Sequence, residues 1–406
     1  MKILLIALII IVFIINITLK LLELKQAKKP LPVTVQDIYD EAKYHEWQRY
    51  QKDRFKVALI YNVTTFLVAL VLFSFNLHSV IFNFIVSLTP RLYLQTLLVA
   101  TFVSLLGIFT TIINFYETFV VEEKYGFNKT TKKLFIKDTL IKFVLVTVLL
   151  ATFVYLLNIL YAAFENVYIF LGVALGATVV LILLMPILQP LFSRLFNKMT
   201  PMEPCSLKDK IIAYAEEIDF PVTNIYVVDA SKRSSKANAY FLGFGKKKRI
   251  VLFDTLIENL TEEEIVAVLA HEVGHSKHKH ILKLMPFSLL TISLMLVTLF
   301  YFVSLGEVAS AFNVTNLEFI FGLLLFQEIF PLIGYLTNMM NNALSRKYEY
   351  EADRYAAETY QKAEIISALK ALTRSNMSNL NPHPLNVFIN HSHPVLHERI
   401  DALQEK

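Results

Sequence analysis

Seven long apolar runs alternate with polar segments along the 406-residue chain. The runs cover residues 3–19, 57–77, 93–115, 143–163, 167–188, 286–305 and 319–339. Each is close to the ~20 residues that a helix needs to cross the hydrocarbon core of a bilayer. The pattern therefore predicts seven transmembrane helices; the alternative is seven buried helices of a large soluble domain. A further apolar stretch, 79–88, is too short to span and is expected to cap the bundle or to lie along the membrane.

The polar segments between these runs predict the fold of the remaining chain. In the fifth segment, Asn224–Val228 has the composition of a β-strand, and Ala239–Leu242 and Ile250–Phe253 flank Gly243 and Gly245 as a hairpin would. A helix is then expected to begin at Thr261, where Thr261 and Glu264 form a capping box. The predicted fold class is an all-α polytopic membrane protein of seven transmembrane helices, with a cytosolic domain that contains a small β-hairpin or sheet.

Composition and charge agree with a membrane protein and orient it. The chain is 55% hydrophobic and 18% charged, whereas soluble proteins carry about 25% charged residues. Of its 39 Lys and Arg residues, only Lys2 and Arg91 fall on one side of the predicted spans. The positive-inside rule then places the N-terminus outside and the C-terminus in the cytosol. The first run continues into Lys20 without a small-residue cleavage site, so we expect a retained signal anchor.

Three other features exclude classes of function and divide the chain. The net charge is only +5, and the basic residues follow the topology, so no nucleic-acid partner is expected. Cys205 is the only cysteine, which excludes an intrachain disulfide and a thiolate-rich metal site. The expected organisation is five N-terminal helices with cytosolic loops 20–56 and 116–142, then a cytosolic segment, a helical hairpin and a cytosolic tail, with domain bounds 1–188, 189–285, 286–339 and 340–406.

The most informative motif is His271-Glu272-Val273-Gly274-His275. On a helix, histidines four residues apart lie on one face and can both bind a zinc ion. Glu272 would then be placed to take a proton from a water molecule held by that metal, which is the H-E-x-x-H arrangement of zinc proteases. Gly274 lowers helix propensity, so it indicates close packing or function. His278 and His280 lie nearby, but we expect them to form a solvated basic patch with their lysine neighbours.

A third protein ligand is usual at a catalytic zinc site. Glu349 and Asp353 in the tail are four residues apart, so on a helix one could bind the metal while the other orients a ligating histidine. Spacing alone leaves open an ordinary charged helix stabilised by ion pairs. Glu351 is expected to point away from both carboxylates toward solvent.

The chain resembles the CAAX prenyl protease family of integral-membrane zinc endopeptidases, the a-factor-converting type. The resemblance is carried by Glu122–Lys129, Asn238-Ala239-Tyr240, Arg249–Leu256, HEVGH, Ser345–Asp353 and His391-Ser392-His393-Pro394 with Arg399. It implies one Zn²⁺ per chain bound by His271, His275 and Glu349, with Glu272 as the general base. It also implies that Asp353 orients a ligand, that Asn238 and His393 bind substrate and steady the oxyanion, and that Arg399 lies at the substrate site or braces it. From the residues alone, Asn238 and His393 could equally be turn residues.

The resemblance further implies that the helices form a barrel around a chamber. It also implies that the substrates are peptides or proteins, which include prenylated or membrane-associated ones. Glu328, with Gln327, lies inside the seventh run, where it would face a cavity or bond to a neighbouring helix. The strand near 250–254 is expected to pair with an extended substrate. The abundance of Ile, Lys, Phe and Asn favours a bacterial cytoplasmic membrane over the endoplasmic reticulum, and in a bacterium membrane-protein or peptide quality control becomes the expected role. The competing function is a multi-pass transporter or channel with a decayed protease domain.

Overall fold

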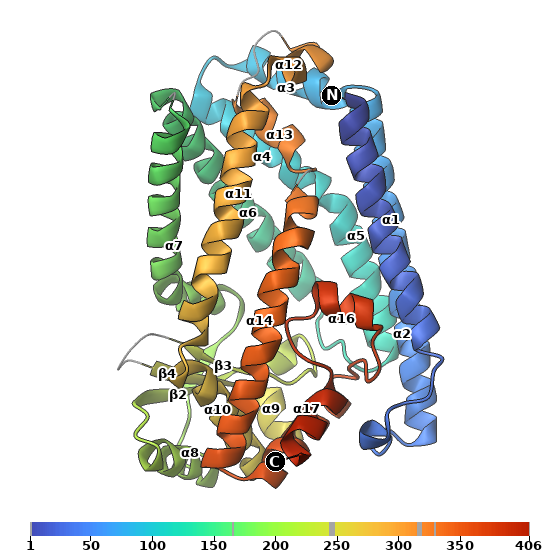
Figure 1. Ribbon diagram of the computed structural model, residues 1–406, viewed down its shortest axis with the longest axis vertical. Coiled ribbons are helices and arrows are strands. Elements are labelled where there is room, and N and C mark those ends of the chain that lie inside the picture. Colours follow the sequence, from blue (N-terminus) through green and yellow to red (C-terminus); the bar gives the residue numbers. More distant parts are fainter. Residues whose placement is uncertain (1, 165, 243–247, 315–318, 329, 406) are drawn as a thin grey trace.

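The structure is a computed structural model that describes residues 2–164, 166–242, 248–314, 319–328 and 330–405. Long helices run along the major axis of an elongated molecule, and a small sheet with short helices lies at one end (Figure 1). The strands are β1 (Met199–Pro201), β2 (Val222–Val228), β3 (Ala239–Leu242) and β4 (Lys248–Phe253). The helices are α1 (Lys2–Gln26), α2 (Glu41–Ser74), α3 (Leu77–Leu88), α4 (Leu92–Leu106), α5 (Ile108–Tyr116), α6 (Lys132–Ala163), α7 (Val167–Phe196), α8 (Ser206–Glu217), α9 (Asp254–Asn259), α10 (Glu262–Lys277), α11 (His280–Ser304), α12 (Gly306–Ala311), α13 (Phe319–Phe326), α14 (Phe330–Thr359), α15 (Lys362–Ser375), α16 (Pro384–Asn390) and α17 (Leu396–Gln404), with short η1 (Val33–Val35), η2 (Glu117–Glu122) and η3 (Ala230–Lys232).

Six helical segments in the described part of the chain are long and apolar enough to cross a membrane. They are α1, α2, the segment Leu92–Glu122 that contains α4 and α5, α6, the first part of α7, and α11. The pair α13 and α14 passes the same test together but is bent by 59°. Only 11% to 28% of each of the six apolar windows is buried, so most of these side chains face outward, as lipid-facing residues do. Six of the seven predicted spans are therefore confirmed by length and composition, and the seventh corresponds to the bent pair of α13 and α14, which counts as one span only if the two helices are taken together.

The helices meet through a core of aromatic and aliphatic side chains. Phe170 packs against Phe300 with ring centroids 5.4 Å apart, which joins α7 to α11. Gly322 of α13 lies so close to α11 that a Cβ there would meet the Val303 side chain at 2.5 Å. The broken seventh span therefore still contacts its partner in the hairpin closely.

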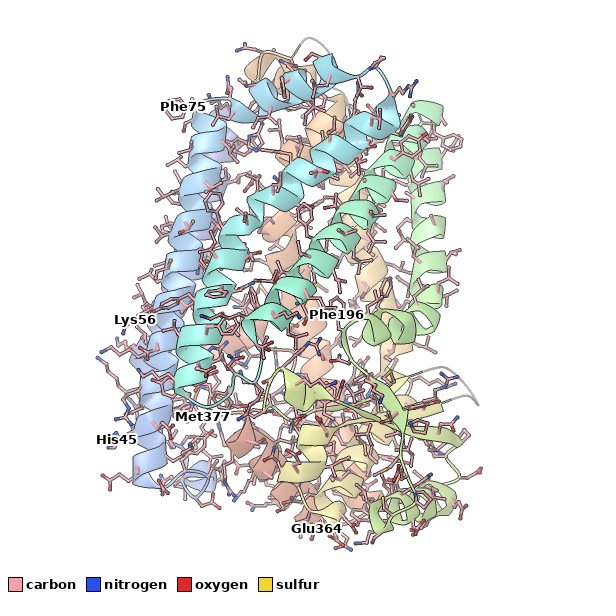
Figure 2. The ribbon with its side chains drawn as sticks, turned by 180° about the vertical axis from the view of Figure 1, so that it is seen from behind. His45, Lys56, Phe75, Phe196, Glu364 and Met377 are labelled. Carbon is pink, nitrogen blue, oxygen red and sulfur yellow. The ribbon has the colours of Figure 1, made fainter. Side chains whose placement is uncertain are left out.

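The short apolar stretch lies across one end of the bundle. Helix α3 crosses this end beside α12, near the N-terminus of the chain (Figure 1). Its Phe82 ring is 5.1 Å from the Phe321 ring of α13. Of the two placements expected for this stretch, a cap on the bundle or a position along the membrane, its course across the end of the helices (Figure 1) favours the cap. Figure 2 shows α2 reaching this end near Phe75, while His45 lies at the other end.

The polar segments come together at the end opposite α3. Arg233 in the fifth segment forms two hydrogen bonds to Asp138 at the start of α6, of 2.8 and 3.2 Å. Lys236 pairs with Glu122 at 3.1 Å. Glu23 at the end of α1 accepts hydrogen bonds from Asn379 and from the backbone N–H of His383 in the tail, at 2.9 and 3.0 Å. The segments predicted to share one side of the membrane therefore do share one end of the molecule.

The four described strands form one sheet in the order β1-β2-β4-β3. Strand β3 pairs antiparallel with β4, which confirms the predicted hairpin; its connecting residues, Gly243 and Gly245 among them, lie outside the described residues. Strand β4 also pairs in parallel with β2. The expectation that residues 250–254 offer an edge to substrate is therefore wrong, because both sides of β4 are already paired. Strand β3 is the edge on that side.

Helix α10 begins as the sequence predicts and is buried along most of its length. Thr261 accepts a hydrogen bond from the backbone N–H of Glu264 at 3.2 Å, and the Glu264 carboxylate accepts one from the backbone N–H of Thr261 at 2.9 Å, so the capping box is confirmed. A Cβ at Gly274 would lie 3.0 Å from the Ala352 Cα of α14. The glycine thus permits the close approach of α10 and α14, which confirms the packing reason inferred for it.

Two of the cavities in the described part of the chain lie beside the predicted spans. The larger, about 580 Å³, is lined by residues of α1, α2 and α5 and of the tail. The smaller, about 290 Å³, is lined by α2, α4 and α5 and by Gln327 and Glu328 at the bend between α13 and α14. Of the two environments expected for Glu328, its position favours the cavity.

Candidate metal centre

Three potential ligands from two helices converge at the buried contact between α10 and α14. His271 and His275 lie on successive turns of α10, and their Nε2 atoms are 3.1 Å apart. Glu349 of α14 places its Oε2 3.4 Å from the His271 Nε2 and its Oε1 3.3 Å from the His275 Nε2. The residues predicted as ligands are therefore brought together, although 74 positions separate the second histidine from the glutamate in the sequence.

These separations fit one tetrahedral metal ion. Ligand atoms about 2.0–2.1 Å from a zinc ion are roughly 3.3–3.4 Å from one another at tetrahedral angles, and the observed distances of 3.1 to 3.4 Å fall beside that value. The Glu349 carboxylate is buried, and within the described residues its Oε2 has no hydrogen-bond donor placed on it. A cation would satisfy that oxygen.

A carboxylate and a guanidinium hold His271 from the side away from the ligand cluster. The Nδ1 of His271 lies 2.8 Å from an oxygen of Asp353, which is buried one turn after Glu349 on α14. Arg399 of α17 donates two hydrogen bonds to Asp353, of 2.7 and 2.6 Å. Its Nη2 is also 3.5 Å from Glu349 Oε2. Asp353 therefore lies where an orienting acid is needed. Arg399 braces this acid and also lines the cavity that opens onto the ligands, so bracing and substrate binding both remain proposals for it.

A cavity of about 430 Å³ opens onto the ligands. Glu272, Asn238 and His393 line it together with His271 and Glu349. Burial raises the pKa of the Glu272 carboxyl, and the adjacent imidazoles oppose that shift. The His393 Nε2 is 3.3 Å from Glu349 Oε1, while 64% of its side chain is exposed, so it can reach a molecule in the cavity.

Asn238 connects this cavity to the sheet. It immediately precedes the edge strand β3. Its backbone C=O accepts a hydrogen bond from the N–H of Phe253 at 3.1 Å, and its side-chain oxygen accepts one from the N–H of Ala239 at 2.9 Å. Its side-chain conformation is therefore fixed by its own backbone at the start of the strand.

Two expectations near the site are wrong. His280 does not lie in a solvated patch: it is 2% exposed, and its Nδ1 is 2.9 Å from the Nδ1 of His275. Glu351 does not simply face solvent, because its carboxylate is 3.2 Å from the His280 Nε2. The cause is Lys279, whose backbone has a left-handed φ of 55° between α10 and α11. This turn folds His280 back onto α10, and the sequence shows no sign of it because lysine has no preference for that conformation.

Comparison with known families identifies the chain. A model of peptidase family M48 matches residues 201–406, and a model of the CAAX prenyl protease N-terminal region, five membrane helices, matches residues 20–198. The chain belongs to peptidase family M48. The two matches meet near the end of α7, where the helical bundle leads into the segment that carries α10.

Relatives of this M48 peptidase match it along most of their length. CAAX prenyl protease 1 of Saccharomyces cerevisiae is 32% identical over 414 residues, covering 93% of this chain and 89% of that protein. The CAAX prenyl protease 1 homolog of Arabidopsis thaliana is also 32% identical, covering 97% and 95%. The crystal structure of S. mikatae Ste24p is 31% identical and superposes with a TM-score of 0.92 over 99% of this chain and 98% of that one.

These matches settle the class of protein. The chain is a membrane-embedded metalloendopeptidase with the predicted fold, a polytopic helical membrane protein with a small sheet. The match of residues 201–406 to a peptidase family, and the ligands gathered within them, argue against a transporter with a decayed protease domain.

Proposed function

We propose that this M48 chain is a zinc endopeptidase that cleaves peptides with a prenylated CAAX-type C-terminus at the cytosolic face of the membrane. The relatives named CAAX prenyl protease 1 support the substrate class. The single observation that carries the chemistry is the convergence of His271, His275 and Glu349 atoms at 3.1 to 3.4 Å.

The donor set supports zinc as the metal, with one ion per chain. Two imidazoles and one carboxylate at tetrahedral spacing leave one position open, which is the arrangement of catalytic zinc sites. When bound, zinc supplies a Lewis acid that polarises a carbonyl group and makes water nucleophilic near neutral pH.

The residues that line the cavity supply proton transfer and charge stabilisation. Glu272, half-buried beside the ligands, takes the proton of the attacking water and passes it to the leaving amine. The His393 imidazole, and the Asn238 amide at the cavity wall, face the developing oxyanion. One such donor contributes roughly 3–4 kcal/mol in comparable sites. Asp353 and Arg399 keep His271 in its ligating orientation.

Strand β3 is the surface that would align an extended substrate. It is one of the two edge strands of the described sheet, and Asn238, just before it, lines the cavity. Main-chain hydrogen bonds to such an edge supply affinity that depends little on sequence. A peptide added beside β3 would therefore reach the cavity at the position of Asn238.

The location and physiological role follow from the charge pattern and the composition. The N-terminus lies at the end opposite α10 in Figure 1, which accords with an outside N-terminus and a cytosolic tail. The division into bounds 1–188, 189–285, 286–339 and 340–406 is retained as a proposal. The bacterial membrane and quality control also remain our predictions, with the endoplasmic reticulum as the alternative, since relatives such as those of yeast and plant are eukaryotic.

The test uses the purified full-length protein and two synthetic peptides that differ only in a farnesyl group on the CAAX cysteine. We expect zinc-dependent cleavage of the farnesylated peptide, and Glu272→Gln should keep zinc but lose about 10²–10⁴-fold in rate. Glu262→Gln, at the exposed start of the same helix, is the matched control and should cleave normally. Undiminished cleavage by Glu272→Gln removes this residue from the mechanism. Equal cleavage of both peptides removes prenyl recognition and favours quality control.

A further inference from the structure

The Nδ1 of His275, the ring nitrogen that points away from the ligand cluster, contacts another imidazole. The Nε2 of His275 faces Glu349 and His271 in the ligand cluster, and its Nδ1 lies 2.9 Å from the Nδ1 of His280. The outer nitrogen of His271, in contrast, faces the carboxylate of Asp353. The two ligating histidines are therefore supported by different groups, one an acid and the other an imidazole.

The tautomers along this contact are determined by the ligand role of His275. A neutral imidazole carries one proton, so an Nε2 that donates its lone pair to a metal leaves the proton on Nδ1. Two Nδ1 atoms 2.9 Å apart cannot both carry a proton or both present a lone pair without repulsion. His275 therefore donates, and the Nδ1 of His280 accepts.

Glu351 completes the chain of hydrogen bonds. A His280 that accepts at Nδ1 must carry its own proton on Nε2. That nitrogen lies 3.2 Å from a carboxylate oxygen of Glu351 on α14, so the Nε2–H donates to this oxygen. The hydrogen-bond chain therefore runs from Glu351 through His280 and His275 to the metal position. Each imidazole proton in this chain is placed by the neighbouring group.

The surroundings hold the His280 ring in the required plane. The ring of Tyr348 is stacked on it at 4.4 Å and 8°, and the ring of His278 lies nearly parallel to it at 5.5 Å and 12°. The left-handed turn at Lys279 brings His280 back to α10. His280 is almost fully buried, so water competes little for its hydrogen bonds.

The same residues could instead form a second metal site. One nitrogen each of His278 and His280 and a carboxylate oxygen of Glu351 lie within 4.8 Å of one another. A metal on the Nε2 of His280 would leave its proton on Nδ1, directly opposite the proton on the Nδ1 of His275. A metal ion at each of the two sites could then be bound only if the 2.9 Å contact between His275 and His280 were broken, or if one of these neutral imidazoles lost its remaining N–H proton. The close contact therefore favours the hydrogen-bond chain.

We propose that His280 and Glu351 are positioning residues that fix His275 in the tautomer and orientation that present its Nε2 to the metal. This inference rests on the proposed metal centre. Partners of this kind typically change metal affinity 10–100-fold when they are removed. Neither residue touches the cavity that holds substrate, so their effect reaches the reaction only through His275.

The experiment measures the zinc dissociation constant by competition with a chelator, the zinc content per chain and the melting temperature of the zinc-free protein. His280→Phe keeps an aromatic ring against Tyr348 but cannot accept a hydrogen bond from His275, whereas the side-chain oxygen of His280→Asn can replace the lost acceptor. His278→Phe is the matched control, because it keeps a ring beside His280 and removes the nitrogen that the alternative metal site would need. Glu351→Ala removes the far end of the chain.

We expect one zinc ion per chain in the wild type and an affinity 10–100-fold lower in His280→Phe. His280→Asn should recover most of this loss, Glu351→Ala should show a smaller loss, and His278→Phe should bind like the wild type. The inference is overturned if His280→Phe binds zinc normally, if His280→Asn binds as poorly as His280→Phe, or if the wild type binds two ions and His278→Phe one. Glu349→Ala separates the two proposals. If this variant binds zinc like the wild type, the metal centre itself is refuted. If it loses zinc, the metal centre stands and the His280 variants alone test the positioning role.

Discussion

Replacing Gly274 with alanine tests whether the contact between α10 and α14 sets the geometry of the metal centre. The added Cβ would lie 3.0 Å from the Ala352 Cα, 3.2 Å from the Ala352 carbonyl oxygen and 3.2 Å from the Tyr355 Cβ. Two of these atoms belong to the backbone of α14, so a side-chain rotation cannot relieve them. The helices must move apart.

The size of the movement can be compared with the tolerance of a metal site. Ordinary contacts begin at 3.4 Å, so α14 must shift by about 0.4 Å or more at Ala352. Glu349 lies one helical turn before Ala352 and would move with it. Metal–ligand distances tolerate about ±0.2 Å, so we expect zinc affinity to fall at least 10-fold. Stability should change less, because overpacking costs about 1–3 kcal/mol and alanine regains ~1 kcal/mol of helix propensity.

The assay is zinc affinity by chelator competition, together with thermal unfolding of the zinc-free protein. Gly176→Ala on α7 is the matched control, since a Cβ there meets nothing within 4 Å. It should leave zinc affinity unchanged. Wild-type zinc affinity in Gly274→Ala would refute the reasoning, because it would show that the two helices do not meet closely beside the ligands.

Two further substitutions separate support of the ligands from support of the helix. Arg399→Lys replaces a planar donor of two hydrogen bonds with a single ammonium, so Asp353 should hold His271 less well. We expect the zinc affinity, measured by chelator competition, to fall about 10-fold. An unchanged affinity would show that Arg399 does not brace the site. Thr261→Ala removes the capping hydrogen bond to Glu264 and should cost about 1 kcal/mol of stability. Its zinc affinity, measured beside thermal unfolding, should stay normal; a large loss of zinc without a loss of stability would contradict the role assigned to the cap.

Local signals in the sequence predicted most elements of the fold. Apolar runs of membrane-spanning length and the capping residues at Thr261 report on short-range physics, which the sequence displays directly. The charge distribution also predicted correctly that distant polar segments meet at one end of the molecule. These features need no knowledge of how strands or helices pair.

Features that depend on tertiary pairing were predicted less well. The sequence at 250–254 is compatible with an edge strand, but this strand pairs in parallel with β2. Strand β3 lies between these two strands in the sequence, so no local pattern indicates that they pair. The seventh span is broken between Phe326 and Phe330, which the continuous apolar run did not predict. Helical spacing placed Glu351 away from Glu349 correctly, yet could not show that another histidine occupies that side.

His280 illustrates the limit within the candidate site itself. Its neighbours Lys277 and Lys279 are charged, so the sequence pattern assigned it to a solvated basic patch. A single left-handed residue, Lys279, separates α10 from α11, and the His280 that follows it is buried against His275. A positive φ at a lysine cannot be predicted from the residue type. The contact between His275 and His280, on which the further inference depends, follows from this conformation.

The central claim is that one metal ion is held jointly by α10 and α14. Anomalous diffraction at the zinc absorption edge, from crystals of the zinc-loaded protein, tests it most directly. The account predicts a single strong peak about 2.0–2.2 Å from the Nε2 atoms of His271 and His275 and from a carboxylate oxygen of Glu349. A peak bound by the two histidines without Glu349, or centred among His278, His280 and Glu351, would contradict it.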